Sequence, residues 1–449
     1  MARLAALMAR IWELPVSLSV TPLDLMDESG ARLHDAGDPL ASFRDRFYVP
    51  PDTIYLDGNS LGLLSRDAEA ALLGALDDWK RLGIAGWLGA EPAWFSLGEE
   101  LGARTAPLVG AEAEAVVVTG STTVNLHNLV ATFYRPTEER RQIVATALDF
   151  PSDVYALGSQ IALKGGDPAC DLVLVPSRDG RTVAEADIVA AMTDEVALVM
   201  LPSVLYRSGQ LLDMERLTAA AHERGITIGW DCAHSVGAVP HRFDDWGVDF
   251  AFWCSYKYLN AGPGAVGALY VNRRHWGRAP GLAGWWGYHK ERQFDMVHAW
   301  EGAPAAGAWQ IGTIPVLAAA PLLGALAITT EAGLHRIRAK SLAQTDYLID
   351  LLEGFGLTDA SYGYRIGTPR EHARRGGHVA VEHDQGPRVA RALKRRGITP
   401  DFRQPDVVRL APVALTTTYL DLWRTVGALK AIVDEGEHLH GEAGREAVA

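Results

Sequence analysis

An acid and an amine follow two successive apolar runs in the middle of the sequence. The run 226–230 ends at Asp231, and the run "VDFAFWC" at 248–254 leads to Tyr256 and Lys257. Taken alone, the aspartate is typical of a helix cap and the lysine of a surface loop. An ammonium group between aromatic residues and glycines is costly to bury unless the amine is used, and a desolvated amine is a good nucleophile toward an aldehyde. Together the two residues favour imine chemistry.

Pyridoxal phosphate is an aldehyde cofactor whose requirements these residues meet. It needs a lysine that forms an imine, an acid that keeps the ring nitrogen protonated, and donors around the phosphate. Lys257 and Asp231 supply the first two. In "VVVTGSTT" a β-branched run breaks at Gly120, and Thr122 and Thr123 open a helix whose free amides favour an anion. Many ordinary helices begin in the same way, so this group is weak by itself.

The stretch "DFPSD" at 149–153 is a further candidate for the same site. It follows the apolar run "RQIVATA" and presents Phe150 and Asp153 on a proline-stiffened loop. An aromatic face can stack on a pyridine ring, whereas Phe150 without this context is as typical of a hydrophobic core.

Alternating apolar runs and helix-length segments between about 115 and 275 predict an α/β fold with a mostly parallel sheet. In such a sheet the site lies at the carboxyl ends of the strands, where the four groups above are expected. We predict an N-terminal arm over 1–50, a large domain over 51–320 and a smaller α+β domain over 321–449. The predicted strands are "AVVVTG", "RQIVATA", "DLVLVP", "VALVMLPSVLY", "GITIGWD", "VDFAFWC" and "GALYV".

Composition excludes several classes of protein. The 449 residues carry 55 acidic and 42 basic side chains, a formal net charge of −13, and no Lys/Arg-dense block that would bind nucleic acid. Three cysteines without a CxxC pair predict neither a disulfide framework nor a structural metal, and they favour a reducing cytoplasm.

Two stretches resemble membrane segments without fitting one well. Arg10 and Glu13 interrupt the apolar core that a signal peptide would need. Residues 302–330 carry no charge, but their prolines, glycines and alanines favour buried packing or a subunit interface over a membrane span.

Eight stretches in order along the chain, from about residue 35 to 440, resemble the kynureninase family. The longest is highly specific, whereas "FPSD" alone would not be. The stretches are "YLDGNSLGLL" (55–64), "TTVNLHNL" (122–129), "FPSD" (150–153), "YRSGQLLDM" (206–214), "DCAHSVGAV" (231–239), "DDWGVDFAFWCSYKYLNAGPG" (244–264), "GWWG" (284–287) and "RLAPVALTTTY" (409–419).

The resemblance implies a pyridoxal-phosphate-dependent transferase fold of type I, a cytoplasmic homodimer with active sites at the subunit interface, and a place in tryptophan and kynurenine metabolism. The implied reaction is hydrolysis of L-kynurenine to anthranilate and L-alanine. Lys257 would hold the cofactor and move protons, Asp231 would pair with the ring nitrogen, and Tyr256 would relay a proton. The other cofactor residues that it implies are Thr122, Thr123, Phe150, Pro151, Ser152, Asp153, Ser203, His234, Trp285 and Thr313, of which Trp285 and Thr313 come from the neighbouring subunit.

For the substrate, the resemblance implies that Arg409 binds the α-carboxylate. The aromatic-ketone end would include Ser60, Trp87 and Gly312, a set similar to bacterial members, so kynurenine is expected to be preferred over its 3-hydroxy form. The sequence departs from the family in its first 28 or so residues, an extension expected to be disordered. It also departs at Ser235 and Ala238, where alanine and asparagine are usual; neither position carries one of the roles named above.

Three other functions stay open at this point. A cysteine desulfurase needs a thiol on a loop well after the lysine, but Cys254 is the last cysteine. A class V aminotransferase is not excluded by cysteine count, although it does not explain "GWWG" together with "SYKYLNAG". A binding module derived from the fold would predict the loss of Lys257 or Asp231, and both are present.

Overall fold

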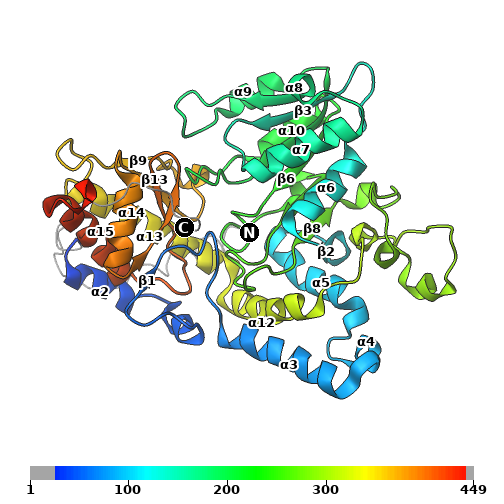
Figure 1. Cartoon of the computed structure of the whole chain (residues 1–449), viewed down its shortest axis with the longest axis horizontal. Coiled ribbons are helices and arrows are strands. Elements are labelled where there is room, and N and C mark those ends of the chain that lie inside the picture. Colours follow the sequence, from blue (N-terminus) through cyan, green and yellow to red (C-terminus); the bar gives the residue numbers. More distant parts are fainter. Residues whose placement is uncertain (1–25, 441–449) are drawn as a thin grey trace, which may run out of the picture.

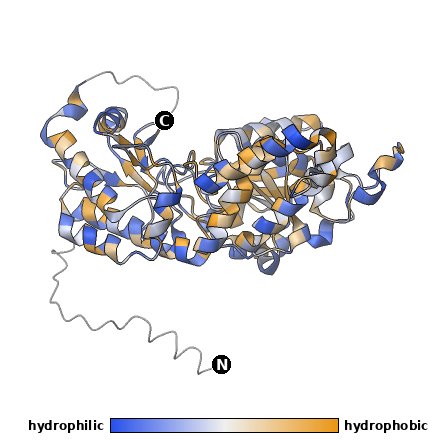
Figure 2. Cartoon of the chain, turned by 90° about the horizontal axis from the view of Figure 1, so that it is seen from below, coloured by the Kyte–Doolittle hydropathy of each residue, from blue (hydrophilic) through white to orange (hydrophobic). Residues whose placement is uncertain are grey.

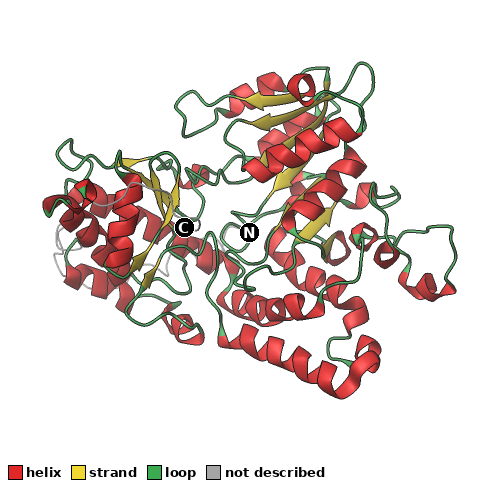
Figure 3. Ribbon diagram, in the orientation of Figure 1, coloured by secondary structure: helices red, strands yellow, loops and turns green. Residues whose placement is uncertain are grey.

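The computed structural model describes residues 26–440 and has a seven-stranded sheet at the centre of its larger part (Figures 1 and 3). Strand β8 runs antiparallel to both of its neighbours, and every other pair in the sheet is parallel. The predicted mostly parallel sheet is therefore confirmed, with a strand in each of the seven predicted runs. In spatial order the strands are β2 (Val116–Val118), β8 (Ala268–Val271), β7 (Phe250–Trp253), β6 (Thr227–Asp231), β5 (Val196–Pro202), β3 (Gln142–Thr146) and β4 (Leu172–Val175).

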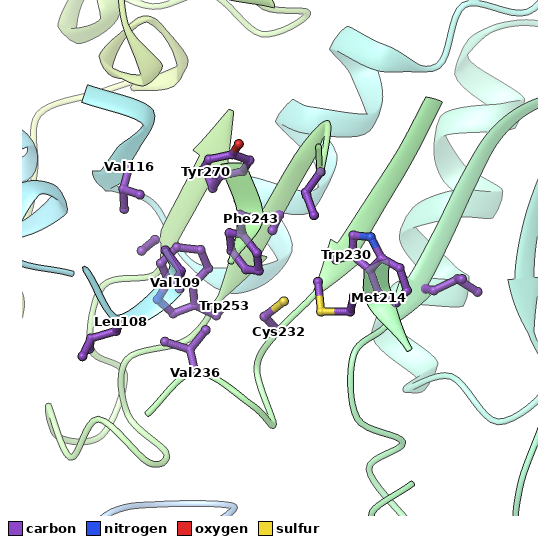
Figure 4. Close-up of a cluster of buried hydrophobic side chains, with 14 of the residues drawn as sticks. Leu108, Val109, Val116, Met214, Trp230, Cys232, Val236, Phe243, Trp253 and Tyr270 are labelled. Atoms are coloured by element: carbon purple, nitrogen blue, oxygen red, sulfur yellow. The ribbon is translucent and has the colours of Figure 1, made fainter. Parts of the chain in front are cut away.

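Helices cover both faces of this sheet, which explains why its strands are apolar without interruption. Along β7, Phe250 and Phe252 face one core cluster, while Ala251 and Trp253 face the other. Figure 4 shows Trp230, Trp253 and Tyr270 on the second side, and Figure 2 shows hydrophobic residues gathered on the strands. The helices α6 (Thr122–Phe133) and α7 (Pro151–Leu163) contribute to the first cluster, and α5 (Leu97–Val109), α10 (Met214–His222) and α12 (Val316–Ala332) contribute to the second.

The smaller part is built on an antiparallel sheet in the order β12 (Asp401–Arg403), β13 (Val407–Leu410), β10 (Val379–Glu382) and β9 (Arg365–Ile366). The N-terminal segment joins it, because β1 (Ile54–Tyr55) pairs in parallel with β11 (Ile398–Thr399) and α2 (Glu28–Ala36) contacts α15. The predicted α+β architecture is thus present beside the larger sheet (Figure 1). Its helices are α13 (Leu334–Gly354), α14 (Gly386–Arg395) and α15 (Tyr419–Asp434).

The remaining helices are short or lie at the edges of the large domain. Helix α3 packs along α12. A yellow-green segment with three 3₁₀ helices stands out from the large domain on the side away from the small one (Figure 1). The remaining α-helices are α3 (Arg66–Leu82), α4 (Gly86–Gly89), α8 (Pro168–Asp171), α9 (Glu185–Ala191) and α11 (Phe243–Trp246). The three 3₁₀ helices are η7 (Trp285–Gly287), η8 (Lys290–Asp295) and η9 (Ala306–Trp309).

The predicted boundary between residues 320 and 321 falls inside helix α12. Because α12 packs on α3 and on the core of the larger sheet, we propose Gly333 as the division instead. There the chain adopts a φ of +78°, and α12 and α13 meet at 77°. Of the predicted N-terminal extension, residues 1–25 lie outside the described part of the chain.

The uncharged stretch 302–330 contributes most of α12. Between residues 26 and 440, no individual helix has the length and hydropathy of a membrane span; α12 and α13 reach both criteria only when they are taken together across their bend. In α12 the residues that face α3 and the sheet are buried.

Candidate active site

One pocket collects most of the predicted cofactor residues at the carboxyl ends of the central strands. Strand β6 ends at Asp231, β7 leads to Lys257, and Phe150 follows β3 at the start of α7. This is the edge at which ligands bind in open α/β sheets. The lining residues are Thr122, Thr123, Leu148, Phe150, Ser152, Asp153, Pro202, Val204, Tyr206, Asp231, Ala233, His234, Tyr256 and Lys257.

Lys257 and His234 form a close pair inside this pocket. The Nζ atom of Lys257 lies 2.8 Å from Nε2 of His234. Burial, reinforced by the positive charge of Lys257, holds the pKa of His234 well below its usual range. The imidazole is therefore neutral near pH 7, and its Nε2 can accept a hydrogen bond from the lysine amine.

Three buried carboxyl groups lie near this pair. Burial raises the pKa of Asp153 well above its usual range, and the negative charge of Asp231 raises it further. Burial also raises the pKa of Asp231, but the charge of Lys257 and the Ala233 N–H, which donates to Asp231 Oδ1 at 2.8 Å, act in the opposite direction. We infer that Asp153 holds a proton and that Asp231 carries the negative charge. Burial raises the pKa of the third group, Asp149, to about 7.

The N-terminus of α6 provides a site for an anion at the opposite end of the pocket. Thr122 and Thr123 begin this 12-residue helix, and the hydroxyls of Thr123 and Ser152 lie 2.9 Å apart. A Cβ atom at Gly267 would lie 3.1 Å from the backbone nitrogen of Thr122. Glycine at this position therefore lets the loop before β8 approach the start of α6 closely. Unpaired amides and three hydroxyls in one place suit a phosphate group.

Phe150 and Tyr256 shape the walls between these two ends. The Phe150 ring is 43% exposed, since one side of it faces the pocket, and it meets the Tyr206 ring edge to face at 5.3 Å. Pro151 occupies the first turn of α7 and fixes the entry of the chain into that helix. Burial raises the pKa of the Tyr256 phenol, which therefore keeps its proton at neutral pH.

Arg409 reaches the pocket wall from the small domain. It lies on β13 directly across from Asp401 on β12, and its guanidinium is paired with that carboxylate. It also donates to the Tyr206 carbonyl at 2.6 Å and to Ser60 Oγ at 3.0 Å. Ser60 and Arg409 thus lie beside Tyr206, a lining residue of the pocket. All three guanidinium nitrogens already have partners in this chain, and Arg409 is 1% exposed. A substrate carboxylate would therefore bind in place of the Tyr206 or Ser60 contact.

Ser203 lies beneath the pocket and does not line it. It is fully buried, and its hydroxyl donates to the Asp231 carbonyl at 3.1 Å. Its Oγ is also 2.7 Å from Ser235 Oγ, which in turn lies 2.9 Å from His241 Nε2. Ser235, one of the two positions that depart from the family, thus contacts Ser203 below the end of the Asp231 strand.

Four predicted site residues lie elsewhere in the single chain. Trp87, Trp285, Gly312 and Thr313 do not line the pocket. Trp285 is 46% exposed, and Gly312 and Thr313 are also exposed. Trp285 and Trp87 each lie against Trp286, at ring distances of 5.8 Å and 5.5 Å.

Several residues of the site have no clear signal in the sequence. Tyr206 lies in a stretch that resembles the family, but nothing marks its carbonyl as an acceptor for Arg409. Asp401 holds Arg409 only because β12 and β13 pair in this register, which residue types alone do not reveal. The apolar lining residues, whose types are common in any core, are Leu148, Pro202, Val204 and Ala233.

The donors match pyridoxal phosphate in number and position along the pocket. Lys257 offers the amine for the aldehyde, Asp231 a carboxylate for the ring nitrogen, Phe150 a ring face, and the α6 start a phosphate site. Within residues 26–440, no cluster of three or more His, Cys, Asp or Glu side chains could hold a metal ion.

Two solved structures share the fold of this chain. A cysteine desulfurase from Thermococcus onnurineus matches 89% of this chain and 97% of its own, with a TM-score of 0.72 and 18% identity. A variant of the cystine C–S lyase C-DES with glycine linked to its pyridoxal-phosphate cofactor matches 85% of this chain and 98% of its own, with a TM-score of 0.73 and 18% identity. The chain has the fold of these enzymes, and its pocket offers the donors that pyridoxal phosphate needs.

The sequence comparisons identify the family of the chain. A family model of the kynureninase C-terminal domain matches residues 337–429. A kynureninase from Geobacillus thermodenitrificans is 54% identical over 419 residues, which cover 93% of this chain and 97% of that protein. One from Bacillus anthracis is 56% identical and covers 92% of this chain and 96% of that protein. The chain belongs to the kynureninase family.

Proposed function

We propose that this protein is a kynureninase that hydrolyses L-kynurenine to anthranilate and L-alanine. The observation that carries the proposal is an identity of 54–56% to kynureninases over more than nine-tenths of the chain. The geometry supports it, because the pocket combines a lysine amine, a ring-nitrogen carboxylate and a nearby arginine for an α-carboxylate.

Each site residue has a defined task in this reaction. Bound pyridoxal phosphate withdraws electrons from the substrate Cα and so supplies the sink that carbon–carbon cleavage needs. Arg409 binds the α-carboxylate and orients the amino acid, and Asp231 holds the ring nitrogen. Lys257 Nζ removes the Cα proton and keeps it as an ammonium, and Nε2 of the neutral His234 accepts a hydrogen bond from this nitrogen at 2.8 Å.

The reaction consumes one water molecule at the γ-carbonyl of the substrate. One water adds to the γ-carbonyl, the Cβ–Cγ bond breaks, and the aryl group leaves as the carboxylic acid anthranilate. The Cβ carbon gains a proton, and the three-carbon part leaves as alanine. We propose the Tyr256 phenol as a proton donor, since burial keeps it protonated at neutral pH.

We further propose a homodimer in which each subunit completes the pocket of the other. Trp87, Trp285, Gly312 and Thr313 are half-buried or exposed and lie outside the pocket of their own chain. A second copy related by a twofold axis would bring this surface to the neighbouring pocket. Of these four residues, Trp285 and Thr313 would reach the phosphate end of the cofactor. Trp87 and Gly312 would join Ser60 at the aryl end, where a preference for kynurenine over 3-hydroxykynurenine is proposed. We also propose a cytoplasmic location.

An assay with two substrates tests the reaction and the ring preference together. Purified protein reconstituted with pyridoxal phosphate is mixed with L-kynurenine, and anthranilate fluorescence is followed without any keto acid. Product formation supports hydrolysis, whereas dependence on an added keto acid would indicate an aminotransferase. A kcat/KM for 3-hydroxykynurenine equal to or above that for kynurenine would contradict the proposed preference.

A further inference from the structure

A lysine in the projecting segment of the large domain is enclosed by aromatic rings and an acid. Lys290 Nζ lies 4.1 Å from the centroid of the Trp286 ring and 4.7 Å from that of Phe95. It lies 3.5 Å from Glu99 Oε1 and donates to the Phe95 carbonyl at 3.3 Å. The lysine side chain is 21% exposed. A desolvated ammonium over two rings binds them more strongly than an exposed one does.

The ring beneath this lysine supports Trp87. Trp286 is 3% exposed and meets Trp87 at a ring distance of 5.5 Å and a tilt of 57°. Trp94 meets Trp87 edge to face at 5.8 Å, so two rings hold it from different directions. A side chain at Gly86 would collide with the Trp94 ring, at 2.3 Å from Cβ, which shows how closely α4 approaches it.

The acid that neutralises Lys290 also holds the segment leading to Gly312 and Thr313. Gln310 is fully buried, and its Nε2 donates to Glu99 Oε1 at 2.7 Å. Helix η7 packs against the same segment, because a Cβ atom at Gly287 would lie 2.2 Å from the Ala308 carbonyl oxygen. The backbone just before Gly312 therefore has little freedom to move.

We propose that Glu99, Trp286, Lys290 and Gln310 form a brace that positions Trp87, Gly312 and Thr313 as one surface for the aryl ring of the substrate. The proposal rests on the proposed kynureninase function and goes beyond it by assigning positioning roles to four residues that touch no reacting atom. Lys290 is the centre of the brace, since it contacts both Trp286 and Glu99.

The brace is expected to affect binding of the aryl half of the substrate and not binding of the alanine half. Lys290→Met keeps most of the apolar stem and removes the charge. Loss of a partly desolvated cation–π contact is expected to raise KM for L-kynurenine about three- to tenfold, with kcat changed less than about twofold. The inhibition constant of anthranilate rises in parallel, and that of L-alanine stays unchanged. Lys290→Arg, which keeps the cation, restores most of the wild-type KM.

Lys430→Met is the matched control. Lys430 Nζ lies 5.1 Å from the Tyr362 ring centroid and 2.6 Å from Asp434 Oδ2, so it also joins a cation, a ring and an acid, but on α15 of the small domain. The KM of the Lys430→Met variant for L-kynurenine is expected to match that of the wild type. An active wild type with an unchanged KM in Lys290→Met would overturn the brace alone, as would equal weakening of anthranilate and L-alanine. A wild type that forms no anthranilate would instead remove the proposed function, and the brace with it.

Discussion

The two halves of the proposed active site differ in how far one chain completes them. The cofactor half, formed by Thr122, Phe150, Asp231, His234 and Lys257, lies in one pocket at the strand ends of the central sheet. The aryl half, formed by Trp87 and Gly312 beside Thr313, is half-buried or exposed in the same chain and lies outside that pocket, as does the proposed cofactor residue Trp285. We therefore propose that one chain supplies the lysine, the ring-nitrogen carboxylate and the α6 start, while the aryl ring is recognised only in the assembled dimer.

Lys257→Ala is expected to have the largest effect, because it removes the amine on which the cofactor half depends. Turnover of L-kynurenine should fall by about 10³-fold or more. The visible absorbance band of the reconstituted protein should change as well, since the covalent attachment is lost. Steady-state assays and an absorbance spectrum measure both effects. A variant that keeps its spectrum and more than about a tenth of its activity would show that the attachment lies elsewhere.

Arg409→Lys tests the substrate side of the cofactor half with the charge retained. A lysine cannot reproduce a bidentate fork, so KM for L-kynurenine should rise about tenfold or more, while the cofactor spectrum is unchanged. Arg403→Lys is the control, because Arg403 also donates to Asp401, at 3.0 Å, but makes no contact with Ser60 or Tyr206 in the structure. An equal rise of KM in both variants would mean that Arg409 acts only through Asp401.

Mixed dimers test whether Trp285 and Thr313 act in the pocket of the neighbouring subunit. Lys257→Ala in one chain and Trp285→Ala with Thr313→Ala in the other should each give homodimers of low activity. A hybrid purified through two different tags would contain one intact site of two and should recover about half of the wild-type activity. A hybrid as inactive as its parents would show that each chain supplies these two residues to its own pocket.

The contrast between the halves also explains what could be read from the sequence. The central strands were predictable because burial on both faces makes them continuously apolar, and Asp231 and Lys257 stand out at strand ends. By contrast, the pairing of Arg409 with Asp401 depends on the register of two short strands, and the Ser235 contact depends on a turn beneath the sheet. Neither spacing nor residue type encodes such contacts locally.

Asp57→Asn is expected to have the smallest effect, on stability and not on chemistry. Burial, followed by the negative charge of Asp401, raises the pKa of Asp57 to about 6 in the folded protein. The folded state therefore binds this proton more tightly than the unfolded state, in which an aspartate titrates near about 3.9. Ionisation of Asp57 thus lowers the free energy of unfolding, and this loss grows as the pH rises from about 4 to about 7.

Asparagine cannot ionise, so the variant should gain up to about 3 kcal/mol in unfolding free energy at pH 8 and close to nothing at about pH 4. Urea unfolding of the cofactor-free protein at the two pH values measures this difference. A gain of the same size at both would mean that folding does not shift the pKa of Asp57. In that case burial and the charge of Asp401 would impose no net cost on the ionised Asp57 carboxylate in the folded protein.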